Sequence, residues 1–422
     1  MHKQLSLLVV LVLSITFQIC GQSYKTPFSG FGIGERVQNT LPQNYGMADL
    51  GISNGDIRYI NFANPALLTN NAVYTFSAGL VGGNASLSNG IITEKTGGAN
   101  LSHVAMSFPI ISGKWTSSIV MKPYSYHLYN YLTEGPVTNT TTNSITEVVG
   151  EGGLNAITWS NGVKILNHLS VGLKMNYFFG SIREEVKFSL QDPNASNSYV
   201  NVGVENDDVS GVAFGAGLAY LKPVTKKVNL NVGFTFDPST KLTDRKFKIM
   251  ERRTLTGITL SEDTLFNQFE GTMTLPSQFG FGVSLVNVFK WTAGVDVRLQ
   301  NWSNYSNFDG SNEGLDNSML ISVGGEYTPD AGDINKLLKR VSYRIGFSYE
   351  KTPQLLNNEN IKDIGINFGM SIPVSNISSL DLGFKYGTKG SISKIGLKED
   401  YFKFQMGLTL NDRLWFIKRK FD

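Results

Sequence analysis

The strongest constraint in this sequence is an alternation of apolar and polar residues with period two. Residues 341–349 read Val-Ser-Tyr-Arg-Ile-Gly-Phe-Ser-Tyr, and residues 402–410 read Phe-Lys-Phe-Gln-Met-Gly-Leu-Thr-Leu. The same pattern recurs in 228–236, 291–300 and 380–386. Successive side chains of a β-strand point to opposite faces, so each segment is expected to be a strand with one apolar face.

Two architectures can use such strands, and three features of the sequence separate them. A β-sandwich buries the apolar faces in a dry core, whereas a membrane barrel turns them to lipid and its polar faces to a lumen. The segments here are long, their polar faces are rich in glycine, and the links between them alternate between short and long. Tilted membrane strands joined by short turns at one rim have these properties. The sequence therefore predicts an all-β, fourteen-stranded antiparallel transmembrane β-barrel over residues 71–411.

The alternation also gives the boundaries of the strands. They are predicted at 71–82, 99–111, 114–129, 151–166, 168–189, 208–221, 227–240, 270–286, 289–302, 317–328, 340–350, 361–373, 378–388 and 399–411. Links after even-numbered strands are mostly tight, and the exception, 329–339, is expected to hold a short helix. Links after odd-numbered strands are expected to be long loops, at 83–98, 130–150, 190–207, 241–269, 303–316, 351–360 and 389–398. Short periplasmic turns and long external loops would place both termini on the periplasmic side.

Residues 1–21 have the pattern of a secretory signal peptide. Lys3 precedes an apolar core from Leu5 to Phe17, which is too short to span a bilayer as an anchor. Cys20 is the only cysteine, and a second interpretation makes it a lipidated residue, although no small residue stands in the three positions before it. If Cys20 is removed with the signal, the mature chain can form no disulfide, zinc–thiolate site or cysteine nucleophile. An export signal places the barrel in the outer membrane of a Gram-negative cell.

Residues 22–70 lack the alternation and precede the predicted barrel. Fourteen strands enclose a space that is too wide for side chains alone to fill. The economical prediction is a plug, or hatch, inside the lumen, and the alternative is an ordered periplasmic extension. At the other end, residues 412–422 are either a periplasmic tail or a continuation of the last strand as far as Phe421.

Composition and motifs exclude several classes of function. Charged residues make up only 17% and aromatic residues 11%, which argues against disorder. The net charge of +3 gives no basis for a nucleic-acid partner. Ser160-Asn161-Gly162 resembles part of an outer-membrane phospholipase pattern, but Thr158 stands where that pattern has histidine, and no serine-elbow or zinc-protease motif occurs. We therefore expect no catalytic residues, no cofactor and no metal site.

Several short motifs resemble the FadL-type long-chain fatty acid transporters, which are fourteen-stranded outer-membrane barrels with an N-terminal hatch. Asn64, Pro65 and Ala66 match the Asn-Pro-Ala motif of that hatch in identity and in place. The other motifs are Leu275–Gly280, Gln300–Ser303, Gly325–Tyr327 and Arg344–Pro353. The segments 28–35 and 415–420 look like the Bacteroidota branch of the family. In that branch one relative, the shuttle barrel of type IX secretion, handles proteins and not lipids.

The resemblance implies a passive path for a hydrophobic small molecule. The molecule would enter a pocket in the lumen and leave sideways through a gap beside a kinked third strand, as the hatch moves. Pro123 lies in the third predicted strand, and because proline cannot donate to a ladder, a local break is also expected there on physical grounds. Pro123 would mark either this lateral opening or the membrane rim, where a broken ladder costs little.

Charged residues at the polar positions of the strands are candidates for a role in the lumen. Asp296, Arg298, Glu326 and Arg344 would be costly facing lipid and acceptable facing water or one another. The simpler prediction is that they pair with each other and with the hatch. The second is that Arg298 or Arg344 binds the carboxylate of a ligand.

These arguments lead to a functional prediction with one alternative. The chain is expected to bind and passively transport hydrophobic, fatty-acid-like small molecules, with outer-membrane lipids around it. The alternative is a non-transporting barrel subunit, or a shuttle, of an outer-membrane protein secretion or assembly complex, with protein partners. The patterns do not separate the two, because one fold serves many functions.

Overall fold

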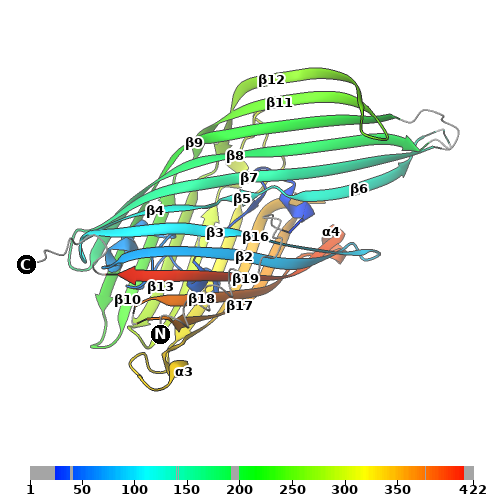
Figure 1. Cartoon of the computed structure of the whole chain (residues 1–422). Coiled ribbons are helices and arrows are strands. Elements are labelled where there is room, and N and C mark those ends of the chain that lie inside the picture. Colours follow the sequence, from blue (N-terminus) through cyan, green and yellow to red (C-terminus); the bar gives the residue numbers. More distant parts are fainter. Residues whose placement is uncertain are drawn as a thin grey trace, which may run out of the picture.

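The structure is a computed structural model that describes residues 24–38, 41–138, 140, 142–191, 199–375 and 377–412. Seventeen β-segments close into a single barrel in which neighbouring segments run antiparallel (Figure 1). Three strands are each broken into two consecutive segments, so the barrel has fourteen strands. The predicted all-β, fourteen-stranded antiparallel barrel is therefore confirmed. The predicted signal peptide, 1–21, lies outside the described residues.

The elements have the following bounds. The barrel segments are β2 (Tyr74–Ser88), β3 (Thr93–Ile111), β4 (Trp115–Pro123), β6 (Tyr129–Pro136), β7 (Asn143–Lys164), β8 (Leu169–Gln191), β9 (Tyr199–Pro223), β10 (Asn229–Asp237), β11 (Thr240–Thr254), β12 (Thr259–Leu275), β13 (Gln278–Asn287), β14 (Trp291–Gln300), β15 (Ser318–Tyr327), β16 (Ser342–Leu356), β17 (Glu359–Pro373), β18 (Ser379–Ser391) and β19 (Leu397–Asp412). The remaining elements are η1 (Pro27–Ser29), β1 (Glu35–Arg36), α2 (Pro42–Tyr45), η2 (Pro65–Asn70), β5 (Ser125–Tyr126), η3 (Trp302–Asn304), α3 (Leu337–Arg340) and α4 (Ile392–Ile395). None of the helices among the described residues is long and apolar enough to cross a bilayer.

Proline accounts for the three broken strands. Pro123 ends β4 before β6, Pro238 separates β10 from β11, and Pro276 separates β12 from β13. Because proline has no N–H to donate to a neighbouring strand, it interrupts a ladder where it occurs. Elsewhere the wall closes without interruption, and β19 pairs with β2 from Lys398↔Ser88 to Asp412↔Tyr74.

Most of the predictions of long loops are wrong, because the strands continue through these segments and form hairpins. The clearest case is 241–269, which forms most of β11 and β12. The alternation disappears there because residues 259–270 are exposed on both faces, so no apolar face is selected. By contrast, 303–316 lies outside the strands, and the short helix expected within 329–339 is confirmed as α3. Residues 413–422 lie outside the described residues.

The barrel wall has an apolar outer face and a polar inner face. On β16, Ile345 and Phe347 are 59% and 45% exposed, whereas Arg344 and Ser348 between and beside them are buried. The same alternation follows β13, where Phe281, Val283 and Leu285 are exposed and Ser284 is buried. Apolar surface arranged continuously around a barrel is the pattern of strands that contact lipid.

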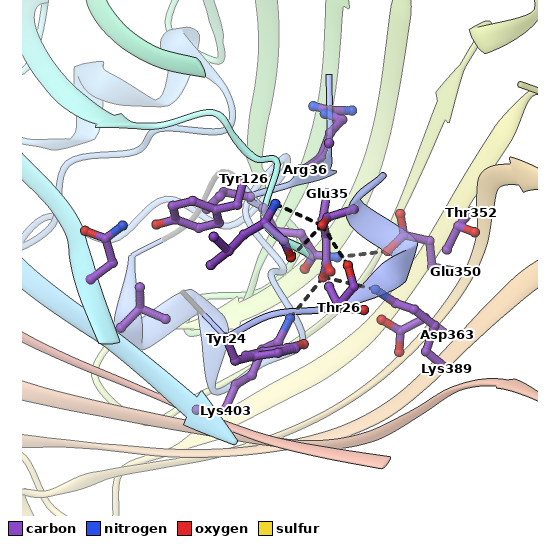
Figure 2. Close-up of a pocket in the computed structure, with 18 of the residues that line it drawn as sticks. Tyr24, Thr26, Glu35, Arg36, Tyr126, Glu350, Thr352, Asp363, Lys389 and Lys403 are labelled. Carbon is purple, nitrogen blue, oxygen red and sulfur yellow. Dashed lines mark hydrogen bonds and ion pairs between the residues drawn. The ribbon is translucent and has the colours of Figure 1, made fainter. Parts of the chain in front are cut away.

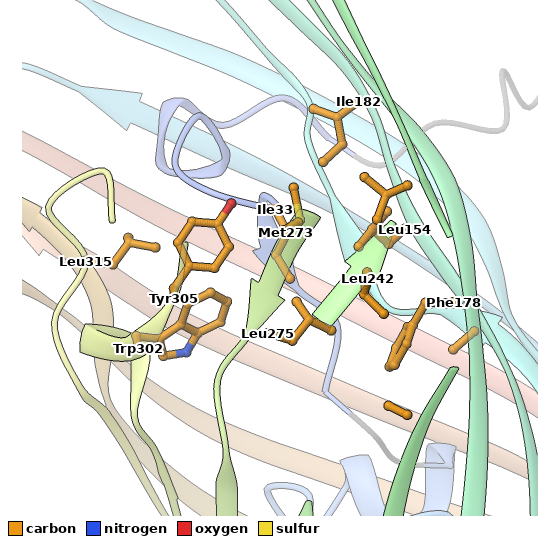
Figure 3. Packing of buried hydrophobic residues seen from close by; sticks show 13 residues of the cluster. Ile33, Leu154, Phe178, Ile182, Leu242, Met273, Leu275, Trp302, Tyr305 and Leu315 are labelled. Carbon is orange, nitrogen blue, oxygen red and sulfur yellow. The ribbon is translucent and has the colours of Figure 1, made fainter. Parts of the chain in front are cut away.

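Residues 24–38 and 41–71 pack against the inward-facing side chains of the strands. The helix η2 contacts β4, β7, β8 and β9, whereas α2 contacts β17, β18 and β19. Between these elements, Met47 lies against Gly324 and Gly346. An apolar cluster links Ile33 to side chains from several strands, with Trp302, Tyr305 and Leu315 beside it (Figure 3). The segment is thus anchored to the wall on several sides.

Candidate functional site

The third strand of the barrel leaves the wall after Pro123. The short segment β5 (Ser125–Tyr126) pairs with β1, the strand formed by Glu35 and Arg36 in the N-terminal segment. Backbone hydrogen bonds flank this pair, because Val37 N donates to Tyr124 O at 2.9 Å and Thr26 N donates to Leu128 O at 2.9 Å. The N-terminal segment therefore satisfies Tyr124 O and Leu128 O, while Tyr124 N and His127 N donate to Leu154 O and Gly152 O of β7.

The break leaves a gap in the ladder of the wall. β3 pairs with β4 only from Val104 to Ile111, while its other half, Thr93–His103, pairs with β2 alone among the described residues. Beyond the break the strand resumes as β6, which is eight residues long and pairs with β7 only within the part of the chain described. Pro123, the candidate for the lateral opening, is the last residue of β4 and stands where this gap between β3 and β6 begins.

A cavity of about 150 Å³ lies directly behind the gap. Residues 81–83 of β2 and 98–100 of β3 form its wall, together with Tyr126 and Leu128 beside the break. The N-terminal segment closes its inner side with Tyr24 and Glu35 (Figure 2). Glycine and alanine on β2 and β3 leave the space that larger side chains would fill.

Charged side chains cluster at the floor of the cavity. The Glu35 carboxylate lies 3.0 Å from Lys389 Nζ and 3.1 Å from Lys403 Nζ (Figure 2). Burial alone would raise the pKa of Glu35, but the two ammonium groups outweigh it and hold that pKa well below its usual range. This ion pair network ties β1 to strands β18 and β19.

Aromatic side chains form another part of the lining. Tyr24, Phe31, Phe62 and Trp302 all face the cavity. Lys403 Nζ lies 5.0 Å from the centroid of the Tyr24 ring, and Tyr24 donates from its hydroxyl to Glu399 at 3.1 Å. The cavity therefore combines apolar rings with buried ion pairs, which suits a small amphipathic or aromatic molecule.

The Asn64-Pro65-Ala66 motif anchors the N-terminal segment to the wall. Asn64 Nδ2 donates to Ile52 O and to Leu218 O, both at 2.9 Å, and Asn64 Oδ1 caps η2 by accepting from Ala66 N at 3.0 Å. Pro65 occupies the first turn of η2. Glycines of the facing strands allow this approach, since a Cβ on Gly172 would lie 2.3 Å from Ala66 N.

The four predicted lumen residues contact the N-terminal segment or one another. Asp296 is 1% exposed, and its carboxylate accepts from Gly51 N at 2.7 Å and Ile52 N at 2.8 Å. Arg298 donates to Asp49 O at 2.6 Å.

Glu326 and Arg344 form an ion pair with each other at 2.5 Å, and Arg344 also donates to Ser371 at 2.6 Å. These contacts correspond to the simpler of the two predictions for these residues. None of the four lines the 150 Å³ cavity.

Sequence reasoning missed the residues at the floor of the cavity. Lys389 and Lys403 occupy inward positions of β18 and β19, and the alternation of those strands could have indicated them. Glu35 gave no signal, because it lies in the segment without periodicity. No group of three or more potential metal ligands occurs among the residues that the structure describes.

Comparison with known proteins identifies the family. The model of the family described as BamG matches residues 1–422. The chain belongs to the BamG family. No curated protein sequence matches this member of the BamG family.

Solved structures share the barrel of this BamG-family chain at low identity. They include a FadL homologue of Pseudomonas aeruginosa, with a TM-score of 0.56 and 13% identity over 90% of this chain and 99% of that one. The Pseudomonas putida toluene transporter TodX matches with a TM-score of 0.54 and 12% identity, over 90% of this chain and 99% of that one. The CymD monoaromatic hydrocarbon channel matches with a TM-score of 0.52 and 14% identity, over 91% and 99%. The resemblance to FadL-type barrels is therefore confirmed at the level of the fold, and the neighbours are channels, not enzymes.

Proposed function

We propose that this chain is an outer-membrane barrel that binds a hydrophobic small molecule and transports it passively through a lateral opening. The observation that carries the proposal is the position of the cavity, which lies behind the gap between β3 and β6. The apolar outer face of the strands supports a membrane location. The fold shared with a toluene transporter and a monoaromatic hydrocarbon channel supports the choice of cargo class.

In this proposal the N-terminal segment, residues 22–70, acts as a hatch. It closes the inner side of the cavity, and it holds the inward turn of the third strand through the pairing of β1 with β5. Movement of β1 would release both the floor of the cavity and the edge of the gap. The ligand would then leave between β3 and β6 into the membrane, without passing along the whole lumen.

Filling the cavity tests the proposal. Gly98→Trp places an indole at the lining of the cavity, and Gly135→Trp is the matched control, because no atom lies within 4 Å of a Cβ at Gly135. Uptake of radiolabelled toluene and oleate is measured in proteoliposomes that contain each purified barrel. We expect the Gly98 variant to lose at least tenfold in rate and the control to keep the wild-type rate. Heat-modifiable migration on a gel verifies that both variants are folded. Equal uptake by two folded variants contradicts the proposal.

A second candidate function is favoured by the family and by the charged floor of the cavity. The name BamG hints at a subunit of an outer-membrane protein assembly complex. The ion pairs of Glu35 with Lys389 and Lys403 also close the cavity with charge, where an apolar path would be expected for a hydrocarbon.

Native mass spectrometry of protein extracted gently from its own membrane separates the two candidates. A retained lipid or aromatic compound on a monomeric barrel supports transport. A stoichiometric protein partner without a small ligand supports the role of subunit.

A further inference from the structure

The hairpin of β11 and β12 extends beyond the rim of the barrel and ends in an open sheet edge. β11 pairs on one side with β9 and on the other with β12. β12 is 17 residues long. Among the described residues it pairs with β11 only, because β14 pairs with β13, the other segment of the same strand (Figure 1). The other edge of β12 therefore presents unpaired backbone groups along its exposed part.

This edge lacks two of the usual protections of exposed strands. Natural edges are commonly guarded by lysine or proline, which oppose the addition of another strand. No lysine, arginine or histidine occurs from Thr254 to Phe289, and the first proline of that stretch is Pro276, after β12 has ended. Shifts of register interrupt the ladder opposite Lys246–Ile249, but Phe269–Leu275 pairs with β11 without a shift.

The edge already accepts one residue of another segment. Thr274 N donates to Ser306 O at 2.8 Å, and the two residues form an isolated antiparallel bridge. Backbone groups alternate in direction along a strand, so the N–H and C=O groups of Thr272 and Glu270 point to the same outer side as those of Thr274. An incoming strand would continue the bridge along this row.

The side chains around the edge define the chemistry of a partner. Phe266, Phe269 and Phe308 form a cluster with ring centroids 6.1 to 6.4 Å apart, and Phe269 is 62% exposed. Exposed carboxylates occur on β12, and the loop that faces the edge contributes one more. They are Glu262, Asp263, Glu270 and Asp309. On the side of β11, Arg245 lies 3.6 Å from Glu270, and Lys246 Nζ lies 5.0 Å from the centroid of the Phe308 ring. β12 and residues 301–317 contain no lysine, arginine or histidine, so the outer edge itself is acidic and aromatic, and it complements a basic and apolar segment.

We propose that the open edge of β12 binds an extended, basic and apolar segment of a partner polypeptide by strand addition. Backbone hydrogen bonds would supply the affinity, and alternating side chains would meet the phenylalanines on one face and Glu262 and Glu270 on the other. The edge lies at the rim that carries the β2–β3 and β6–β7 connections, so the partner segment must reach that side. The interaction does not depend on whether the lumen transports a ligand.

A defined peptide tests the proposal on the full chain in detergent micelles. The probe is a nine-residue peptide that alternates valine and lysine, and its control carries N-methyl groups on every second amide, which remove the backbone donors on one edge. We expect the unmodified peptide to bind, and the methylated peptide to bind at least tenfold more weakly. Binding is followed by fluorescence anisotropy of a labelled peptide at physiological salt.

Two variants locate the binding on β12. The double variant Glu262→Lys/Glu270→Lys should weaken binding at least tenfold, whereas Asp330→Lys/Glu359→Lys makes the same change of net charge at exposed positions away from the edge and should leave it unchanged. Thr272→Pro removes an outward donor and should also weaken binding, since its N–H points away from β11. Heat-modifiable migration verifies that each variant is folded.

Three results would overturn the proposal. The first is equal binding of the methylated peptide, which would indicate attraction by charge alone. The second is equal binding by the edge variant and its control. The third is a concentration-dependent dimer of the chain that is abolished by Thr272→Pro while the peptide fails to bind, which would assign the edge to a second copy.

Discussion

Replacing Glu35 by glutamine should release the N-terminal segment from the barrel. Glu35→Gln keeps the size of the side chain but removes the charge that compensates Lys389 and Lys403. The side chain of Lys389 is only 6% exposed, so its ammonium group would remain buried without its nearest carboxylate. Leaving one partner of a buried ion pair uncompensated costs about 3–5 kcal/mol.

The two lysines do not contribute equally to this cost. The side chain of Lys403 is 23% exposed and can turn toward water, so its loss is expected to be below about 1 kcal/mol. The total is then about 3–5 kcal/mol, which raises the population of the detached segment by at least roughly a hundredfold. The barrel wall itself should stay folded, because its ladders do not involve Glu35.

Limited proteolysis measures this population directly. Trypsin can cut after Arg36 only when β1 has separated from β5, and the rate of cleavage follows the open population when reclosing is fast. We expect cleavage after Arg36 to rise about a hundredfold in Glu35→Gln. The double variant Glu35→Gln/Lys389→Met removes both charges and should return the rate to within about tenfold of wild type. An unchanged rate in the single variant, or equal rates in the single and double variants, refutes the assigned role of this ion pair.

Three further predictions concern the same segment. Deleting residues 22–70 should open a conducting pore in a planar bilayer, and unchanged conductance would show that the segment is not a plug. Gly217→Val should cost about 1–3 kcal/mol in thermal unfolding, because a Cβ there would lie 2.2 Å from Asn64 Oδ1, whereas Gly135→Val should be neutral. Burial, offset in part by Arg298, raises the pKa of Asp49 to about 6. Between about pH 4 and 6, Asp49 is then protonated in the folded chain but ionised in the unfolded chain. The free energy of unfolding should therefore fall by about 3 kcal/mol as pH rises through this range, and then level off. Asp49→Asn should remove this part of the pH dependence, and an unaltered profile of unfolding temperature against pH would contradict it.

The strands of the wall were predictable because each one faces two different environments. Ile345 and Phe347 alternate with Arg344 and Ser348, and this alternation alone located β16. The Asn64-Pro65-Ala66 motif and the break at Pro123 were also visible in the sequence, since a capped turn and a missing N–H are local properties. The extensions of β11 and β12 were not visible, because residues exposed on both faces carry no alternation.

The sequence by itself therefore determined the class of fold, the number of strands and the place where the third strand breaks. Only the tertiary structure decided what meets at that break. Glu35 is separated by more than 300 residues from Lys389 and Lys403, and no periodicity relates them. Closure of the barrel brings β18 and β19 beside the N-terminal segment, and among the described residues the same closure leaves β6 and β12 with one neighbour each. Local patterns report the environment of each residue, whereas the pairing of distant charges and the position of a free edge depend on how the whole sheet closes.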